Sequence, residues 1–389
     1  MQRPPPLRLF RPLRTDGSNA FAFYSMRERV PRIARDTIER NGDYSAAVRR
    51  AIEGLAHDVE RDARLPTPRF PDADVPGWIS AHAEHERETW LGAEWFHAEL
   101  AFYRELVHAC RFWETGRDPF APVKMEELSG ERPWSRLEAA LALASGTRED
   151  RIASLLEACL WGNRVDLSYT VAASLSHRRE EDLLVDERDA ALAFLAVPGA
   201  SVHVVADNAG TELALDLALV GAILESPQST VTLHLKMQPM FVSDAMVRDV
   251  WDLIERMRAR GGGLFGSLAA ELDECFASGR LVLAPDPFWT GPRFFWELPP
   301  HLRAALSSAT VVVLKGDVNY RRLLGDALWP PATPLARASA YTPAPVVCLR
   351  TMKSDPVAGL PDGLAEALDA THPNWRIDGQ RALVQTIVP

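Results

Sequence analysis

The sequence predicts an α/β fold: a mostly helical N-terminal region placed on a three-layer α/β/α domain whose sheet is mainly parallel and doubly wound. Residues 26–185 have a largely helical hydrophobic pattern, and after about Glu187 strand-like and helical segments alternate. The strand-like segments are nearly continuous apolar runs, which are typical of strands covered on both faces. Strands that alternate with helices indicate parallel βαβ units. We therefore expect a helical region over residues 1–186 and an α/β/α catalytic domain over residues 187–389.

In the helical region, four segments carry helical periodicity: residues 32–41, 79–113, 134–143 and 151–160. The second of these is the longest, and its large apolar residues recur at roughly helical spacing. A proline-rich stretch over residues 65–76 separates the first two helices, because proline interrupts helical hydrogen bonding.

In the second region, strands are predicted over residues 201–206, 230–236, 281–284, 310–315 and 345–350, with a late strand over residues 382–388. Helices are predicted over residues 210–225 and 244–259. Gly261, Gly262 and Gly263 follow the second helix and indicate a turn. The aromatic residues Trp289, Phe294, Phe295 and Trp296 could form a lid or a core patch, and we favour the core.

The composition is that of a globular protein, with 47% hydrophobic and 25% charged residues. Lys and Arg number 43 and Asp and Glu number 53, for a net charge of −10. This balance argues against a nucleic-acid-binding protein, which needs a basic surface. A small phosphate remains possible, because it needs only a local basic pocket.

The four cysteines, Cys110, Cys159, Cys275 and Cys348, are far apart in sequence and form no C-x-x-C pair. A zinc site or a disulfide framework is therefore not expected, and a reducing, cytoplasmic setting with buried cysteines fits best. No apolar run approaches the roughly 20 residues that span a bilayer, and no signal peptide is predicted. We expect no membrane partner, and the oligomeric state is left open.

Polar residues follow four of the predicted strands. Since the carboxyl ends of parallel strands form the ligand-binding edge of such a sheet, these residues are expected to meet there. Carboxylate and amide oxygens are the ligands that magnesium and manganese prefer, and cations opposite them would neutralise a phosphoryl group. The residues are Asp207, Asn208 and Glu212; Lys236, Ser243 and Asp244; Lys315, Asp317, Asn319 and Arg321; and Arg350, Thr351 and Lys353.

Each group also has a plain structural interpretation. Asp207 or Asn208 could cap the following helix, and Asp244 could favour a helix dipole. The segment 315–321 could be a solvated loop. The coincidence of these groups at one sheet edge favours a shared site. The polar segment 161–168 (WGNRVDLS), with Asn163, Arg164 and Asp166, could line that site or cap a helix.

Several familiar schemes are absent from the sequence. No H-E-x-x-H pair and no P-loop occur, and Ala209 stands where a haloacid-dehalogenase phosphatase needs its second aspartate. The segment VVADNAGTE has some likeness to the first loop of a Rossmann methyltransferase, but it carries one glycine where such loops usually have several.

Four motifs together resemble a known family. Residues 207–212 (DNAGTE), Lys236 with 241–244 (FVSD), 315–321 (KGDVNYR) and 350–353 (RTMK) are similar to the metal-dependent damage-control phosphatases, also called domain of unknown function eighty-nine. The Arg-Thr-x-Lys element resembles the mark of its third subfamily, which includes a eukaryotic protein described as an acidic residue methyltransferase. WGNRVDLS and AELAFYREL (residues 98–106) also fit, so the resemblance extends from about Phe21 to Lys353.

The resemblance implies roles for these residues. Asp207, Asn208 and Asp244 match the metal ligands, for manganese or magnesium, with cobalt or nickel possible. These three, with Asp317 and Lys353, form the expected catalytic set. The expected substrate-binding residues are Asp317, Asn319, Tyr320, Arg321, Arg350, Lys353 and Glu212, the last of which matches a residue assigned to S-adenosylmethionine in the methyltransferase description. The segment 317–321 matches a substrate-contacting loop, and the helix near Gly210 would direct its positive N-terminus at the phosphate.

The resemblance further implies a metal-dependent phosphoric monoester hydrolase acting on a small phosphorylated metabolite, such as fructose 1-phosphate or fructose 6-phosphate. An alternative is an S-adenosylmethionine-dependent protein-glutamate carboxyl methyltransferase. Methyl transfer needs no cluster of Asp and Asn, and the glycine-rich loop is missing, so we favour the phosphatase. A binding protein without catalytic activity is a third possibility.

Overall fold

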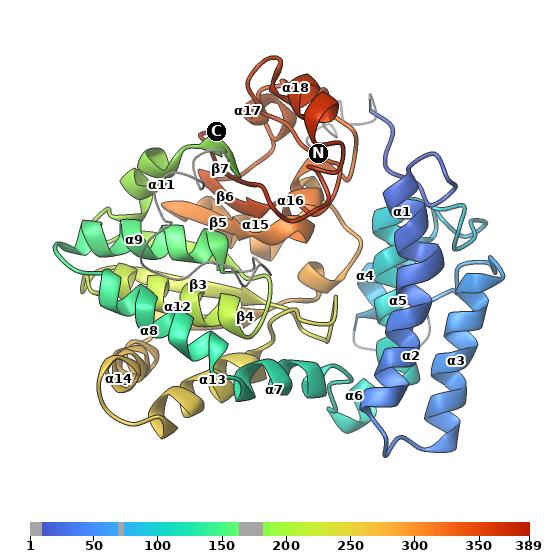
Figure 1. Ribbon diagram of the computed structural model, residues 1–389, viewed down its shortest axis with the longest axis horizontal. Coiled ribbons are helices and arrows are strands. Elements are labelled where there is room, and N and C mark those ends of the chain that lie inside the picture. Colours follow the sequence, from blue (N-terminus) through green and yellow to red (C-terminus); the bar gives the residue numbers. More distant parts are fainter. Residues whose placement is uncertain (1–9, 69–73, 163–181) are drawn as a thin grey trace.

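The computed structural model describes residues 10–68, 74–162 and 182–389. Its first part is a helical lobe, drawn in blue to cyan on the right of Figure 1. The lobe contains α1 (Ala20–Tyr24), a π-helical turn η2 (Ser25–Arg29), α2 (Val30–Arg40), α3 (Ala46–Glu60), α4 (Val75–His82), α5 (Trp95–Ala109) and α6 (Phe112–Thr115). Helix α5 is buried along nearly its whole length. It therefore forms the centre of the lobe, and α1, α2, α3 and α4 bury apolar residues around it.

The rest of the described chain is built on one seven-stranded sheet, in the order β1-β7-β6-β5-β2-β3-β4. All neighbouring strands run parallel except β6 and β7. The predicted mainly parallel sheet is therefore confirmed. The strands are β1 (Leu183–Asp186), β2 (Ser201–Val205), β3 (Thr230–Leu235), β4 (Leu281–Pro285), β5 (Val311–Lys315), β6 (Val346–Thr351) and β7 (Ala382–Ile387).

Helices cover both faces of this sheet, which confirms the three layers (Figure 1). Successive side chains of a strand point to opposite faces, so Val204 joins the core on one face and Val205 the core on the other. The first face carries α8 (Arg132–Leu143), α9 (Arg148–Trp161), α11 (Arg188–Leu195), α12 (Thr211–Leu224), α13 (Val247–Ala259) and α14 (Leu264–Ala277). The second carries η3 (Pro287–Thr290), η4 (Phe295–Glu297), α15 (Pro300–Ser307), α16 (Gly316–Leu324), α17 (Leu335–Ala338) and α18 (Leu364–Thr371).

The winding of the sheet reverses between β2 and β5, which lie side by side. From β2 the chain proceeds to β3 and β4, and the crossover helix α12 packs on the first face. From β5 it proceeds to β6 in the opposite direction, and α16 packs on the second face. A crevice forms outside the carboxyl ends of the strands at such a reversal. The fold therefore places a ligand site after β2 and β5.

One expected helix was wrong, and two further elements differ from interpretations of the sequence. Residues 79–113 do not form one helix, because α4 ends at His82 and α5 begins at Trp95. Thr89 and Glu94, between them, pair instead with Arg64 and Arg14 in short antiparallel bridges. The segment 315–321 is not a loop, since α16 begins at Gly316. Strand β1 lies inside the region expected to be helical.

The expectations for the glycine turn, for two of the four aromatic residues and for the cysteines are confirmed. Helix α13 ends before the glycines at 261–263, and Trp289 and Phe295 are buried in the core of the second face. All four cysteines are buried and unpaired. The division at residue 187 stays a prediction; α8 and α9, which precede it, pack against α12. No helix within the described ranges is long and apolar enough to span a bilayer.

Candidate active site

The loops after β2 and β3 are joined by backbone hydrogen bonds. The Ala245 N–H donates to the Asp207 carbonyl at 2.9 Å, and the Ala209 N–H donates to the Ser243 carbonyl at 2.7 Å. Asn208 and Asp244 face each other in an isolated antiparallel bridge. The three residues predicted as metal ligands, Asp207, Asn208 and Asp244, are therefore brought together from two adjacent strand ends.

The start of α16, directly after β5, reaches the same place through a glycine. Gly316 has a φ of +83°, and a Cβ added there would lie 2.1 Å from Oδ2 of Asp207. No other residue type fits that space without displacing the carboxylate, and few adopt that backbone conformation. Gly316 thus allows α16 to begin directly against Asp207 and places Asp317 beside it.

Asp317 is held by the strand that follows. Arg350 donates through Nε to Oδ1 of Asp317 at 2.8 Å, and the Lys353 N–H donates to the same oxygen at 3.2 Å. Burial raises the pKa of Asp317, but the charges of Arg350 and Arg321 more than offset it, so the pKa lies below its ordinary value. Asp317 is therefore an ionised carboxylate that fixes the backbone from which Lys353 projects.

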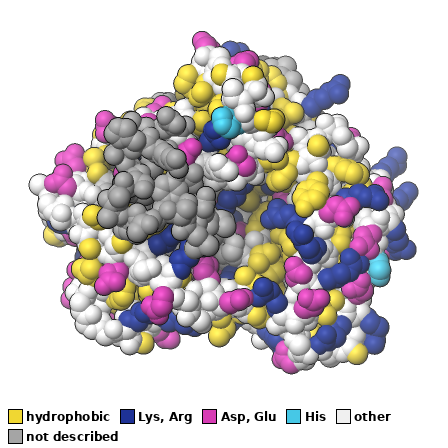
Figure 2. All heavy atoms as spheres, in the orientation of Figure 1, with side chains coloured by type: hydrophobic (Ala, Val, Ile, Leu, Met, Phe, Trp, Pro, Cys, Tyr) yellow, Lys and Arg dark blue, Asp and Glu magenta, His cyan; other side chains and the backbone are white. Residues whose placement is uncertain are grey.

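These strand ends line a cleft of about 140 Å³ between the sheet and the helical lobe. Figure 2 shows this face of the molecule hollowed between its two parts, with basic and hydrophobic side chains around the hollow. Asp207, Asp317 and Lys353 also line a smaller cavity of about 10 Å³ behind it. The cleft is lined by Phe21, Arg29, Trp95, Glu99, Asp207, Asn208, Phe241, Ser243, Asp244, Asp317, Val318, Arg321 and Lys353.

Negative charge is concentrated at the ends of β2 and β3. Burial raises the pKa of Asp207 well above its ordinary value, and the charges of Glu212 and Asp244 raise it further. Burial also raises the pKa of Asp244, to about 6, against the opposing charge of Lys236, whose Nζ lies 3.3 Å from Oδ2. Two buried carboxylates this close are an arrangement that a bound cation would stabilise.

The donor set fits a hard divalent cation. Oδ2 of Asp244 is buried and is paired with Lys236 at 3.3 Å, but a carboxylate oxygen can accept in more than one direction, so it can also bind a cation. Within the described residues, no three His, Cys, Asp or Glu side chains gather as a metal-binding group. The set therefore depends on the amide oxygen of Asn208 as its third ligand, beside Asp207 and Asp244, and oxygen-only sets of this kind suit magnesium or manganese.

Lys353 is available to an anion. In the ranges that the structure describes, its ammonium makes no hydrogen bond or ion pair, and it lies close enough to Asp207 to lower the pKa of that carboxyl. The start of α16 lines the same cavities, through Gly316, Asp317 and Val318, and its N-cap residue Lys315 makes no side-chain capping hydrogen bond within the described part of the chain. An uncapped helix N-terminus presents free N–H groups to an anion.

The N-terminus of α12, near Gly210, was expected to face the phosphate, but a side chain of the protein binds it. The Thr211 N–H donates to Oε1 of Glu127 at 2.9 Å, and the Thr211 hydroxyl donates to the same oxygen at 2.7 Å. Glu127 comes from α7 (Ala121–Ser129). A carboxylate of the protein thus already binds this helix end, and the uncapped α16 faces the cleft instead.

Other predicted site residues serve the framework. Asn319 donates to the carbonyls of Ala206 and Lys315, and the Tyr320 hydroxyl donates to Oε1 of Gln385. Tyr320 lies outside the cleft, so this placement does not support its predicted contact with substrate. Arg321 lines the cleft, but its guanidinium is committed to Glu99 at 2.7 Å and to Asp326 at 2.7 Å.

Sequence reasoning missed the residues that other elements contribute. Phe21, Arg29, Trp95 and Glu99 reach the cleft from the helical lobe, and only Glu99 lies in a motif noted in the sequence. Lys124 of α7 donates to the Asp244 carbonyl at 2.9 Å and so holds the loop after β3. None of these residues follows a predicted strand. Position directly after a strand was the feature of the sequence that indicated the site.

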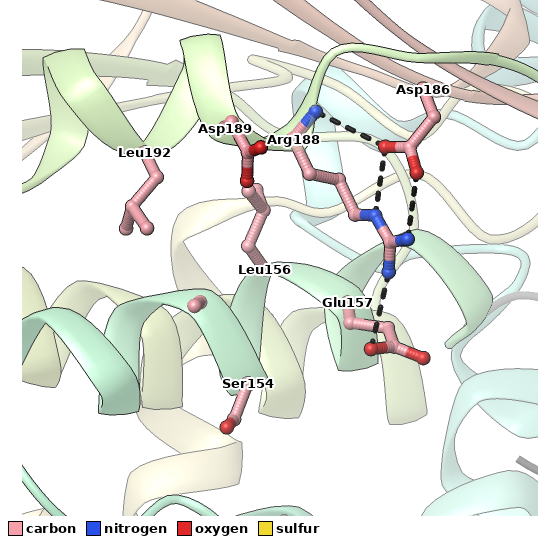
Figure 3. Close-up of a pocket in the computed structure, with 8 residues that line it drawn as sticks. Ser154, Leu156, Glu157, Asp186, Arg188, Asp189 and Leu192 are labelled. Carbon is pink, nitrogen blue, oxygen red and sulfur yellow. Dashed lines mark hydrogen bonds and ion pairs between the residues drawn. The ribbon is translucent and has the colours of Figure 1, made fainter. Parts of the chain in front are cut away.

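One further prediction and one further cavity lie away from this cleft. Asn163, Arg164 and Asp166 are outside the described residues, so the lining role of segment 161–168 stays a prediction. A larger cavity of about 360 Å³ lies between α9 and α11 (Figure 3). Arg188 there is paired with Asp186 and Glu157, and none of the predicted site residues lines it. Cavity size alone therefore does not mark the site.

Comparison with known proteins is consistent with the motifs. Residues 25–368 match the family model described as the damage-control phosphatase ARMT1-like domain. The damage-control phosphatase ARMT1 of Xenopus laevis is 27% identical, with 94% of this chain and 96% of that protein covered. The human protein of the same name is 26% identical at the same coverage. The crystal structure of a domain of unknown function eighty-nine protein from Pyrococcus horikoshii aligns over 92% of this chain and 96% of that one, with 14% identity and a TM-score of 0.46.

Proposed function

The chain belongs to the ARMT1-like damage-control phosphatase family, and from that premise we propose that it is a divalent-metal-dependent phosphatase of small phosphorylated metabolites. One observation carries the proposal. Two buried carboxylates and an amide (Asp207, Asn208 and Asp244) meet the ammonium of Lys353, which no described residue pairs, in one cleft at the reversal of the sheet.

Asp207, Asn208 and Asp244 would hold the cation, manganese or magnesium, with cobalt or nickel as possible substitutes in vitro. Bound there, a divalent ion supplies positive charge to the phosphoryl oxygens and lowers the pKa of water. Without it, the carboxylates of Asp207, Asp244 and Asp317, which line the cleft, would repel an anionic substrate. This explains why the proposal requires a metal.

The chain's own residues would bind and orient the phosphoryl group. Lys353 would neutralise an oxygen of that group, and the free N–H groups at the start of α16 would donate to another. Asp317 holds the Lys353 backbone, and Arg350 holds Asp317. Arg321 is already paired within the protein, so we assign it to the wall of the cleft.

The cleft suits a small substrate. Its volume of about 140 Å³ lies below the roughly 300–1,000 Å³ of sites that hold drug-sized ligands. Sugar phosphates such as fructose 1-phosphate or fructose 6-phosphate are of the appropriate class, and the aromatic rings of Phe21 and Trp95 in the helical lobe would contact the sugar. We propose that these sugar phosphates are substrates and that the protein acts in the cytoplasm.

Phosphate release from a panel of sugar phosphates and p-nitrophenyl phosphate tests the proposal. Wild-type protein is assayed with EDTA or with manganese, magnesium, cobalt or nickel, beside Asp207→Ala. We expect release only with metal and its loss in the variant. If folded wild-type protein releases no phosphate with any of these metals, the proposal is wrong, and binding of S-adenosylmethionine would then be measured by calorimetry.

A further inference from the structure

The side-chain amide of Asn208 is held at both ends. Its Nδ2 donates to Oε2 of Glu212 at 3.0 Å and to Oδ2 of Asp207 at 2.8 Å. Its Oδ1 accepts from the Ser243 hydroxyl at 2.5 Å. A carboxylate can only accept hydrogen bonds, so the NH₂ end of the amide must face Asp207 and Glu212. The oxygen end is thereby turned to the loop that carries Asp244.

Glu212 is itself held in place by Lys315. Oε1 lies 3.3 Å from Nζ of Lys315, whose ammonium also pairs with Asp216 at 2.8 Å and donates to the Cys159 carbonyl at 3.0 Å. Glu212 is 5% exposed and Lys315 is 1% exposed. One oxygen of Glu212 is thus bound to a buried cation and the other to Asn208. This placement leaves little of the side chain for contact with a substrate.

We propose that Glu212 is a positioning residue, which presents the Asn208 oxygen as a metal ligand, and that Lys315 holds Glu212 in place. The inference rests on the proposed function, because it concerns the same metal position. It replaces the substrate-binding or S-adenosylmethionine-binding role that the family resemblance implied for Glu212.

This role requires a carboxylate, because a carboxylate can only accept hydrogen bonds. A glutamine at the same position could donate as well as accept, so the amide of Asn208 would no longer have one preferred orientation. Partners that orient a metal ligand typically contribute 10- to 100-fold to metal affinity. The expected effect of losing the carboxylate is therefore on metal binding itself, and not only on turnover.

Asp216 provides a matched control. Both Glu212 and Asp216 pair with Lys315, but the structure gives Asp216 no contact with Asn208. Glu212→Gln and Asp216→Asn remove the same charge from the same lysine. Only the first changes the hydrogen bonding of the amide.

The test measures the dissociation constant of Mn²⁺ from the free Mn²⁺ signal in electron paramagnetic resonance, for wild type, E212Q and D216N. Melting temperatures without metal establish that each variant is folded. E212D is added because it keeps the charge and shortens the side chain, so it should also release the amide. We expect metal affinity to fall by roughly 10- to 100-fold in E212Q, to fall in E212D, and to change less than about threefold in D216N.

Equal Mn²⁺ affinity in wild type and E212Q would overturn the inference. Equal losses of Mn²⁺ affinity in E212Q and D216N would also overturn it, because they would show that the charge balance at Lys315 controls metal binding. If either variant fails to fold, E212D against wild type decides the question by the same measurement. Wild-type protein that releases phosphate with metal while E212Q binds Mn²⁺ normally would refute only the role of Glu212. Wild-type protein that binds no divalent ion would refute the metal site and this role together.

Discussion

Gly316 allows the start of α16, which carries Asp317, to lie directly against Asp207. A methyl group there would occupy the position of the Asp207 carboxylate, and the backbone φ of +83° disfavours any side chain. We expect Gly316→Ala to lower metal-dependent phosphate release by roughly 100-fold, because a displacement of about 1 Å in a reacting group has effects of that size. Steady-state kinetics with the best sugar phosphate would measure it.

Gly379→Ala is the matched control for Gly316. Gly379 also has a positive φ, of +73°, but nothing lies within 4 Å of a Cβ at that position. Both variants therefore carry a strained backbone, and only one displaces Asp207. If the two variants lose the same activity, backbone strain is responsible and the close approach to Asp207 is irrelevant.

His97 makes the stability of the protein depend on pH. Burial, with smaller contributions from the charges of His85 and His82, lowers the pKa of His97 well below its ordinary value. The unfolded chain therefore binds a proton below about pH 6.5 that the folded protein does not, and stability falls as pH falls. The same sign applies to His234, whose pKa burial lowers to about 3.

His97→Phe isolates this effect. His97 stacks on His85 at 3.9 Å, and its Nε2 is buried without a partner, so a phenyl ring fits the environment. Below about pH 6.5, the free energy of unfolding of wild type should fall faster than that of H97F, by up to about 1.4 kcal/mol per pH unit. Urea denaturation between pH 7.5 and 5.5 measures both, and parallel curves would contradict the prediction.

Residues that follow strands could be predicted as a site because parallel strand ends share one edge of a sheet. Asp207, Asp244 and Lys353 were found in this way, and the structure brings them into one cleft. Their neighbours Arg29 and Trp95 were not found, since they lie on helices of the lobe. Whether a side chain such as Tyr320 points to the cleft or to the core depends on helical phase, which the motif alone did not give.

At the scale of elements, α7 holds the loop that carries Asp244. Nζ of Lys124 lies 2.8 Å from Asp249 and 3.0 Å from Asp118, and it donates to the Asp244 carbonyl. Replacement by methionine would leave two buried carboxylates without their cation. We expect Lys124→Met to lower the free energy of unfolding by roughly 3–5 kcal/mol, measured by urea denaturation.

A surface ion pair of the same helix serves as the control. Glu126, also on α7, pairs with Arg40 at 2.6 Å, but both side chains are largely exposed. Solvent-exposed pairs contribute about 0–1 kcal/mol, so Glu126→Gln should change stability by less than about 1 kcal/mol. Similar effects of the two variants would show that burial of the Lys124 cluster has no special importance.

Strands were predicted more accurately than helices, for a physical reason. Buried strands such as Val311–Lys315 are short apolar runs rich in β-branched residues, and this length and composition favour a strand over a helix. The break between α4 and α5 depends on pairing with residues far away in sequence, at Arg14 and Arg64. Helix α16 begins with glycine and carries charged residues, so the sequence left a solvated loop open as an alternative, and local propensity alone did not decide it.

At the scale of the whole molecule, a buried ion pair joins the helical lobe to the sheet. Arg321 of α16 pairs with Glu99 of α5 at 2.7 Å and lies 3.7 Å above the ring of Trp95. Since hydrogen bonds to charged groups contribute about 1.5–3 kcal/mol, Glu99→Gln should lower the free energy of unfolding by roughly 2 kcal/mol. Denaturant titration would detect this.

Glu53→Gln tests whether the position of the Arg321–Glu99 pair, between lobe and sheet, matters for stability. Glu53 pairs with Arg35 inside the lobe at 2.9 Å, and both side chains are more than one-third exposed. Its removal should change stability by less than about 1 kcal/mol. An equal or larger effect than that of E99Q would mean that the contact between lobe and sheet contributes little to stability.

Strand β7 lies between β1 and β6 and hydrogen-bonds to both. During synthesis on the ribosome, β1 emerges almost two hundred residues before its only partner in the sheet. Until residues 382–387 have been translated, β1 has no neighbour and β6 has an open edge, and such edges invite pairing with other nascent chains. A ribosome that stalls shortly before these residues would therefore leave a chain whose site residues have all been made, yet whose sheet is open to aggregation and to recognition by chaperones.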